Sequence, residues 1–98
     1  MKIKYTHNYI RNVKKYKKCK KYKKKHYDMS LLDECVTALV EQDKKKLKQH
    51  HAHKLTNYYE LHIKGNWLLE YDFDKETGDL ILILIDTGDH DDLKRKRY

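Results

Sequence analysis

The feature that most constrains the fold is an unbroken apolar run, Leu80-Ile81-Leu82-Ile83-Leu84-Ile85. Because the run is short and has a β-branched side chain at every second position, it predicts a strand buried on both faces. In the preceding segment, residues 67–73, apolar side chains alternate with Glu70 and Asp72, which predicts a strand with one wet face. The polar loop 74–79 contains Gly78, so we expect the two strands to form an antiparallel hairpin.

Weaker patterns predict the elements of the first half. Residues 1–5 alternate, which is typical of an edge strand with lysines facing water. A helix is expected from Thr6, a possible N-cap, with its apolar stripe at Tyr9, Val13 and Tyr16. A second helix, residues 28–43, is expected to begin at the capping box that Ser30 forms with Asp33.

The rest of the chain completes a small sheet. Residues 41–49 are expected to be a charged connector, a strand starts near Leu55, and residues 64–66 form a tight turn into the next strand. We therefore predict one α+β domain over residues 1–98, in the order β-α-α-β-β-β, with two N-terminal helices packed on one side of an antiparallel sheet. Residues 1–27 form a basic strand and helix arm, and residues 53–93 hold the strands that carry the site.

The net charge of +8 is divided very unevenly along the chain. Residues 1–27 carry twelve Lys or Arg and no acid, whereas the remainder has a net charge of −4. Such asymmetry favours a polyanionic partner, either a nucleic acid or an acidic protein. Ten basic residues lie between Arg11 and Lys25, among them Lys14, Lys15 and Lys18. The alternative is a solvated lysine-rich surface that binds nothing in particular.

Other classes of protein are disfavoured by the composition. There is no apolar run long enough to cross a membrane and no apolar N-terminal signal segment, so we expect a soluble cytoplasmic protein. Cys19 and Cys35 fit neither a disulfide framework nor a Cys-x-x-Cys site. We expect two reduced thiols, with Cys35 in the core.

Five of the seven histidines lie outside the basic arm, and two of them flank predicted turns. His62 comes just before one turn and His90 just after another, so adjacent strands would bring them to one edge of the sheet. Imidazoles titrate near about pH 6.5, so one can accept a proton while another donates it. Beside a basic groove this suits RNA cleavage, in which the 2′-hydroxyl is the nucleophile and no metal or other cofactor is required.

Each of these residues also has a structural interpretation. A strand histidine such as His62 is more often a half-exposed structural residue, and Trp67 is more often a core residue than a platform for a base. The segment from His50 to His53 offers imidazoles for zinc, but no cysteine accompanies them. The acids at Asp89, Asp91 and Asp92 are typical of a helix N-terminus.

Several motifs in a fixed order resemble the YafQ branch of the RelE/ParE toxin superfamily. These are residues 28–32 (DMSLL), His53-Lys54-Leu55, His62-Ile63, residues 66–71 (NWLLEY) and residues 86–93 (DTGDHDDL). The resemblance extends from near the N-terminus to Leu93 and implies a RelE-like α+β ribonuclease. Such a toxin of a type II toxin–antitoxin pair cuts messenger RNA on the ribosome and is held inactive by its antitoxin.

The resemblance also implies roles for individual residues. His53, His62 and His90 fall on the acid–base positions. Trp67 falls on a motif position beside them and is expected to bind RNA. Three departures are visible: Asn66 replaces an Asp, Asp86 replaces an Arg, and Lys94 replaces an aromatic residue. Cations for the transition state would then come from elsewhere, and the candidates are Lys54, Lys64, Lys94 and Arg95.

Two hypotheses follow for the function. In the first, the protein is a ribosome-dependent endoribonuclease in which His62 and His90 are general base and acid, in either order, and His53 assists. Asn66 holds the substrate, and the basic run from Arg11 to Lys25 binds ribosomal RNA. Its partners are the ribosome with mRNA and an acidic, partly disordered antitoxin segment. In the second, the same fold acts by binding, as a gyrase-directed ParE-like toxin or a weakly active RNA-binding relative.

Overall fold

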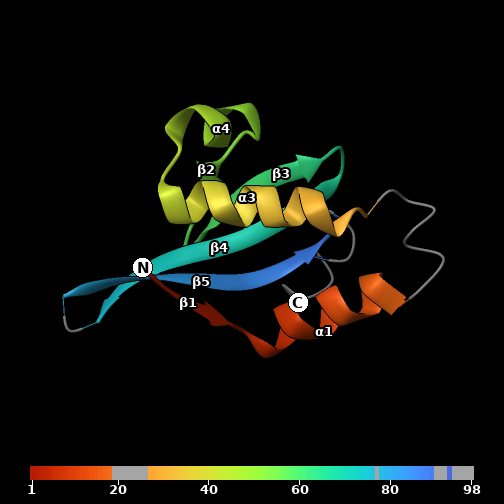
Figure 1. Cartoon of the computed structure of the whole chain (residues 1–98), viewed down its shortest axis with the longest axis horizontal. Helices are drawn as coiled ribbons and strands as arrows, with labels where there is room; N and C mark the ends of the chain where they lie inside the picture. The colour runs from red at the N-terminus through yellow and green to blue at the C-terminus, as the bar shows by residue number, and fades with distance from the viewer. Residues whose placement is uncertain (19–26, 77, 90–92, 94–98) are drawn as a thin grey trace.

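The computed structural model describes residues 1–18, 27–76, 78–89 and 93 of the chain. Its strands are β1 (Lys2–Tyr5), β2 (His53–Lys54), β3 (Tyr59–Lys64), β4 (Trp67–Glu76) and β5 (Asp79–Gly88). Its helices are α1 (His7–Lys18), α3 (Met29–Glu41) and α4 (Lys44–Gln49). The α+β class is confirmed, as Figure 1 shows by the helices beside the sheet. Side chains of α1 and α3 form one core cluster with those of β3, β4 and β5.

The sheet has the strand order β1-β5-β4-β3-β2, with the apolar run of the sequence in β5. β5 pairs with β4 on one side and with β1 on the other, and Leu82 and Leu84 are completely buried. The pairing of β1 with β5 is parallel, so the sheet is mixed and the expectation of a purely antiparallel sheet was wrong. Parallel strands need a long crossover connection, and the chain between β1 and β5 provides one because these strands lie near opposite ends of the sequence.

The hairpin of β4 and β5 is confirmed, but its strands are longer than expected. Pairing continues to Glu76 and Asp79, so most of the polar segment 74–79 belongs to the ladder. Gly78 has φ +85, a left-handed conformation that glycine adopts without steric cost. The polar side chains there indicate a solvent-exposed ladder rather than a loop.

α1 has the cap and the apolar stripe that the sequence predicts. The Tyr9 amide donates to the Thr6 hydroxyl, and Tyr9 and Tyr16 are buried against the sheet. The Tyr16 hydroxyl donates a hydrogen bond to the carbonyl of Thr87, which attaches the last turns of the helix to the end of β5. The predicted fraying of this helix through residues 20–25 lies outside the described residues.

α3 begins two residues earlier than the capping box would place it. The N-cap is Asp28, whose carboxylate accepts hydrogen bonds from both the amide and the hydroxyl of Ser30. Ser30 is therefore the second helical residue, and the predicted Ser30–Asp33 box was wrong. The expected core face is present, with Leu32, Cys35 and Leu39 buried.

The charged connector is a helix, α4, which the sequence analysis missed. Asp43 caps it by accepting from the Lys46 amide, and Leu47 packs against the core cluster. Lysine has a high helix propensity, so one cap and one apolar anchor are sufficient here. Likewise, the strand expected from Leu55 starts only at Tyr59, after a turn closed by the Leu55 amide and the Tyr58 carbonyl. None of the helices described has the length and apolar character to cross a membrane.

Candidate functional site

β3 divides its side chains between the two faces of the sheet. Leu61 and Ile63 are buried in the core cluster that includes residues of α1 and α3. Because side chains alternate along a strand, Glu60 and His62 project from the opposite face. The candidate site therefore lies on the sheet face that is turned away from these two helices.

His62 lies where the central strands end. It pairs with Leu68 of β4, and Leu68 pairs with Gly88 of β5. The β3–β4 turn is formed by Gly65, with φ +56, and Asn66, which is exposed. A positive φ at the first position of a two-residue loop is typical of hairpin turns, so the predicted tight turn is confirmed. The ring of His62 contacts this turn, with its Nδ1 3.2 Å from the Gly65 carbonyl oxygen.

His53 lies beside His62 on the neighbouring strand β2. The two ring centroids are 6.4 Å apart, and the rings are inclined by 33°. The Nδ1 atom of His53 lies 2.8 Å from the carbonyl oxygen of His51. Two of the three histidines singled out from the sequence are thus close together, whereas His90 lies outside the described residues.

Both rings have a defined hydrogen-bonding state. A carbonyl oxygen only accepts, so the Nδ1 atoms of His53 and His62 must carry the hydrogen in these contacts. In the neutral ring the other nitrogen, Nε2, then has the lone pair. Each imidazole is therefore arranged to accept a proton at Nε2, or to donate one from Nε2 when it is protonated.

Two further histidines belong to this cluster, although the sequence analysis considered them only as zinc ligands. The ring of His51 is exposed and meets the ring of His62 edge-on, with centroids 5.9 Å apart. The Nδ1 atom of His50 lies 2.8 Å from the carbonyl oxygen of His62. Within the described ranges, no group of three or more His, Cys, Asp or Glu residues is arranged to hold a metal ion, so the zinc hypothesis gains no support.

A row of acidic residues crosses the same face of the sheet. Glu60 pairs with Glu70, and Glu70 pairs with Asp86, so the three carboxylates follow one another across β3, β4 and β5. All three are buried, with Asp86 only 1% exposed. Asp86 accepts hydrogen bonds from the side chain of Asn12 and from the Thr87 amide. The sequence showed only that Asp86 is not a cation; its alignment with two other acids depends on strand register.

Trp67 occupies the core rather than the surface. Its side chain is 2% exposed, and its indole N–H donates to the Thr87 hydroxyl at 2.8 Å. That hydroxyl donates in turn to the Leu68 carbonyl, and the Tyr27 ring packs on the indole with centroids 4.8 Å apart. The indole is therefore not accessible to RNA, and the expectation that it binds RNA is corrected. Its observed role is to join β4 to β5 next to Asn66.

The predicted cations lie on two sides of this region. The α1 side chains Arg11, Lys14, Lys15 and Lys18 are exposed, as are Lys54 and Lys64, whereas Lys94 and Arg95 lie outside the described residues. The Nζ atom of Lys54 lies 5.8 Å from the centre of the Tyr59 ring. This contact is within the range of a cation–π interaction and places the ammonium group over Tyr59, the residue with which Lys54 pairs across β2 and β3.

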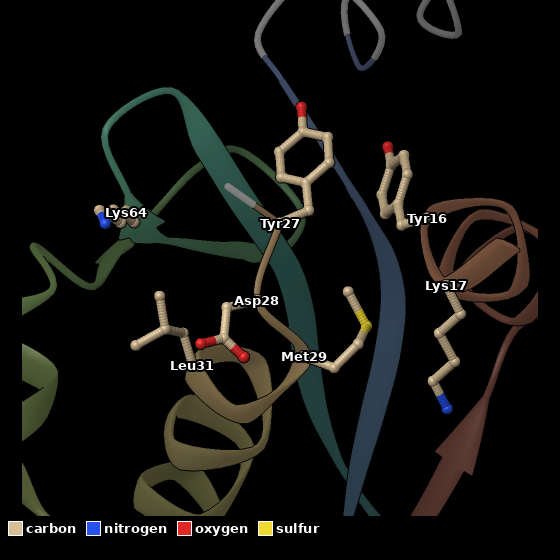
Figure 2. Close-up of a pocket in the computed structure, with 7 residues that line it drawn as sticks. All are labelled: Tyr16, Lys17, Tyr27, Asp28, Met29, Leu31 and Lys64. Carbon is tan, nitrogen blue, oxygen red and sulfur yellow. The ribbon is translucent and has the colours of Figure 1, made fainter. Parts of the chain in front are cut away.

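A cavity of about 460 Å³ lies between α1, the start of α3 and the β3–β4 turn. Figure 2 shows Tyr16 and Lys17 reaching it from α1, Asp28, Met29 and Leu31 from the start of α3, and Lys64 from the strand end. The two hydrogen bonds from Ser30 hold the pKa of the Asp28 carboxyl below its ordinary value, and the charge of Lys64 adds to this. The lining of the cavity thus includes two cations, Lys17 and Lys64, and one carboxylate, Asp28.

Comparison with known proteins identifies the family of the chain. Residues 1–95 match the family described as the bacterial toxin of type II toxin–antitoxin systems, YafQ. A search of curated protein sequences gives no match.

Solved structures with the same fold include YafQ from E. coli strain BL21(DE3), with a TM-score of 0.73 and 23% identity over 93% of this chain and 94% of that one. The E. coli DinJ–YafQ complex gives a TM-score of 0.72 and 24% identity over the same shares. A YoeB/ParE toxin from Agrobacterium tumefaciens gives 0.63 and 12% identity, over 92% of this chain and 99% of that one. Because the family match covers almost the whole sequence, the chain belongs to the YafQ family of toxins of type II toxin–antitoxin systems.

Proposed function

We propose that this toxin is a ribosome-dependent endoribonuclease that cleaves mRNA through attack of a 2′-hydroxyl. The observation that carries the proposal is the convergence of His53 and His62 on one edge of the sheet, each with Nδ1 bonded to a carbonyl, so that Nε2 is the nitrogen that exchanges a proton. Register supports the participation of His90, which follows β5 closely in the sequence. Gly88 lies two strands from His62, roughly 10 Å away at the usual strand spacing.

The proposed reaction needs one base, one acid and positive charge. The base removes the proton of the 2′-hydroxyl, the 2′-oxygen forms a bond to phosphorus, and the bond from phosphorus to the 5′-oxygen breaks. The acid protonates that leaving oxygen. His62 and His90 fill these two roles in either order, His53 assists them, and the amide of Asn66 hydrogen-bonds the substrate. No metal or other cofactor takes part in this scheme.

In this proposal, basic side chains near the histidines supply the positive charge that the reaction needs. Lys54 directly follows His53, and Lys64 lies two residues after His62. In this proposal both lysines stabilise the charged phosphorane, together with Lys94 and Arg95. The exposed side chains Arg11, Lys14, Lys15 and Lys18 of α1 contact ribosomal RNA. Removing one cation that binds a phosphate should reduce the slope of log Kd against log salt by about 0.7 to 0.9. We therefore expect Lys14→Gln and Lys18→Gln each to flatten that slope, measured with purified ribosomes.

The partner in the cell is a cognate antitoxin, consistent with the complex known for the E. coli relative, DinJ–YafQ. We propose that an acidic segment of the antitoxin covers the basic arm, which carries a net charge of +12 over residues 1–27. Charge complementarity of this kind speeds association and is sensitive to salt. Such a segment would fold as it binds.

The catalytic assignment is tested by expressing variants in a growth assay and mapping mRNA cleavage on translating ribosomes. His62→Asn is the sharpest change, because the asparagine amide can still donate to the Gly65 carbonyl while Nε2 is removed. We expect His62→Asn and His90→Ala to relieve toxicity and abolish cleavage. His7→Asn, at the exposed first residue of α1, is the control and should remain toxic. If His62→Asn and His90→Ala cleave like the parent protein, the assignment is wrong.

A binding function on the same fold is the alternative, and the buried acidic row favours it. Glu60, Glu70 and Asp86 place negative charge on the face that an RNA phosphate would approach. Asn66 also lacks the carboxylate found in the family pattern. Under this alternative the toxin binds RNA without cutting it or acts on DNA gyrase. Measuring RNA cleavage on translating ribosomes together with DNA supercoiling distinguishes the two functions, because only the ribonuclease cuts RNA and only a gyrase-directed toxin changes supercoiling.

A further inference from the structure

We propose that the turn formed by His50 and His51 is the positioning element of the histidine site. It comes directly after α4, and it holds His62 and His53 through separate hydrogen bonds. This inference rests on the proposed ribonuclease function and extends it to two histidines that have no role in that scheme.

The first half of the turn fixes the backbone of β3. The His62 amide donates to the His50 carbonyl at 2.8 Å, and the His50 ring donates from Nδ1 to the His62 carbonyl, also at 2.8 Å. Two reciprocal bonds of this kind act like one step of a β-ladder. They fix both the position and the rotation of the peptide groups from which the His62 side chain projects.

The second half of the turn fixes the ring of His53. The His51 carbonyl accepts the hydrogen bond from Nδ1 of His53, which determines the tautomer of that ring. For its carbonyl to point there, His51 takes φ +54, a left-handed conformation that is uncommon for residues other than glycine. The same conformation places the exposed His51 ring edge-on to His62.

α4 fixes the position of the turn formed by His50 and His51. The amides of His50 and His51 donate to the carbonyls of Lys46 and Lys48, and the Ala52 amide donates to the Leu47 carbonyl. Leu47 and Ala52 pack against the main core. The short helix α4 therefore connects the turn, and through it His53 and His62, to the core.

Three substitutions at His50 separate positioning from general stability. His50→Ala removes the donor to the His62 carbonyl. His50→Asn keeps a donor at the position of Nδ1, whereas His50→Gln places its amide at the position of Nε2. Misplacing a reacting group by about 1 Å costs on the order of 100-fold in rate. We therefore expect His50→Ala and His50→Gln to lower the single-turnover cleavage rate on ribosomes by about 10- to 100-fold. His50→Asn should restore most of the rate, and ribosome affinity should be unchanged in all three.

The conformation of His51 provides a second, independent test. His51→Gly removes the ring but favours the positive φ, so it should preserve the bond to His53 and most of the activity. His51→Val disfavours that φ because it is β-branched, and it should lower the rate. Gln42, the exposed C-cap of α3, has φ 53 and provides the matched control. Gln42→Gly and Gln42→Val should leave the cleavage rate unchanged.

Two measurements keep this inference distinguishable from the ribonuclease proposal. Amide hydrogen exchange at His62 reports the bond from its amide to the His50 carbonyl. The ¹⁵N shifts of the imidazoles report whether Nδ1 of each ring carries the hydrogen. Both can be measured whether or not the protein cleaves RNA. We expect fast exchange at His62 in His50→Ala and slow exchange in His50→Asn. If the parent protein does not cleave mRNA, the ribonuclease proposal fails, and these two measurements still decide whether the turn holds the histidines. If His50→Ala shows the parent's exchange, tautomers and rate, or if asparagine rescues no better than glutamine, the positioning role is overturned.

Discussion

The hydroxyl of Thr87 is the best place to test whether buried hydrogen bonds hold β4 and β5 together at the end of the sheet near His62. Thr87 is completely buried, and its hydroxyl accepts from the Trp67 indole at 2.8 Å and donates to the Leu68 carbonyl at 2.7 Å. Thr87→Val keeps the shape of the side chain but leaves the indole N–H and one carbonyl lone pair without a partner. The substitution therefore removes two buried hydrogen bonds with little change in volume.

The expected decrease in stability follows from the two groups separately. A buried donor without a partner costs about 1 to 3 kcal/mol. The Leu68 carbonyl has a second lone pair, so its share is smaller, and the total should be about 2 to 4 kcal/mol. For a domain of this size each kcal/mol shifts Tm by roughly 4 to 8 °C, so the Tm of Thr87→Val should be lower than that of the parent by at least about 8 °C.

The assay is urea denaturation of the parent and of Thr87→Val, together with a double-mutant cycle. Trp67→Phe removes the indole donor, so Thr87→Val should cost at least about 1 kcal/mol less in that background. Thr37→Val, at an exposed position of α3, is the control and should change stability by less than about 0.5 kcal/mol. The reasoning is refuted if Thr87→Val is as stable as the control, or if the cycle shows no coupling.

Three further predictions concern other parts of the fold. Asp43→Ala removes the cap of α4 and should lower the free energy of unfolding by about 1 kcal/mol. In this variant, amide hydrogen exchange should be accelerated more at His62 than at Leu82, because the turn after α4 bonds to His62. The pKa of Asp28 lies below its ordinary value of 3.8, so its charge stabilises the fold above that pH and this contribution disappears as the pH falls through the lower folded value. Denaturation of Asp28→Asn and the parent between pH 7 and acid should therefore show a difference that vanishes only in strong acid. Burial raises the pKa of the Cys35 thiol to about 11, so in a Cys19→Ser variant iodoacetamide should label Cys35 at pH 8 only when urea is added, as mass spectrometry can determine.

The sequence predicts those parts of the fold that depend on local pattern. The run from Leu80 to Ile85 and the alternation before it are periodic over enough residues to identify β5 and β4. The partner of β1 was not predictable in this way, because the pairing of Lys2 with Ile81 joins the two ends of the described chain. α4 was missed because Leu47 is its only large apolar residue, so it has no stripe for a periodicity argument to detect.

The site shows the same limit more clearly. His53 and His62 were expected from the family motif, and their positions beside turns and strands make them recognisable. His50 was not expected at the site. Its bond to His62 depends on the left-handed conformation of His51, which no sequence pattern predicts. The acidic row was also hidden, since Glu60, Glu70 and Asp86 align only once the register of three strands is known. Trp67 was misjudged because a tryptophan next to a turn has the same sequence signature whether it faces solvent or core.

The parallel pairing of β1 with β5 has a consequence for when the fold can be completed. The first strand has no partner until residues 81–84 have been synthesised and have left the ribosome, and the Thr6 amide then closes the ladder on the Leu84 carbonyl. Pairings this distant in sequence form late and slow the folding of small domains. A nascent toxin therefore completes its sheet only after nearly all of its strands have emerged, so most of the chain must be synthesised before the complete fold can exist.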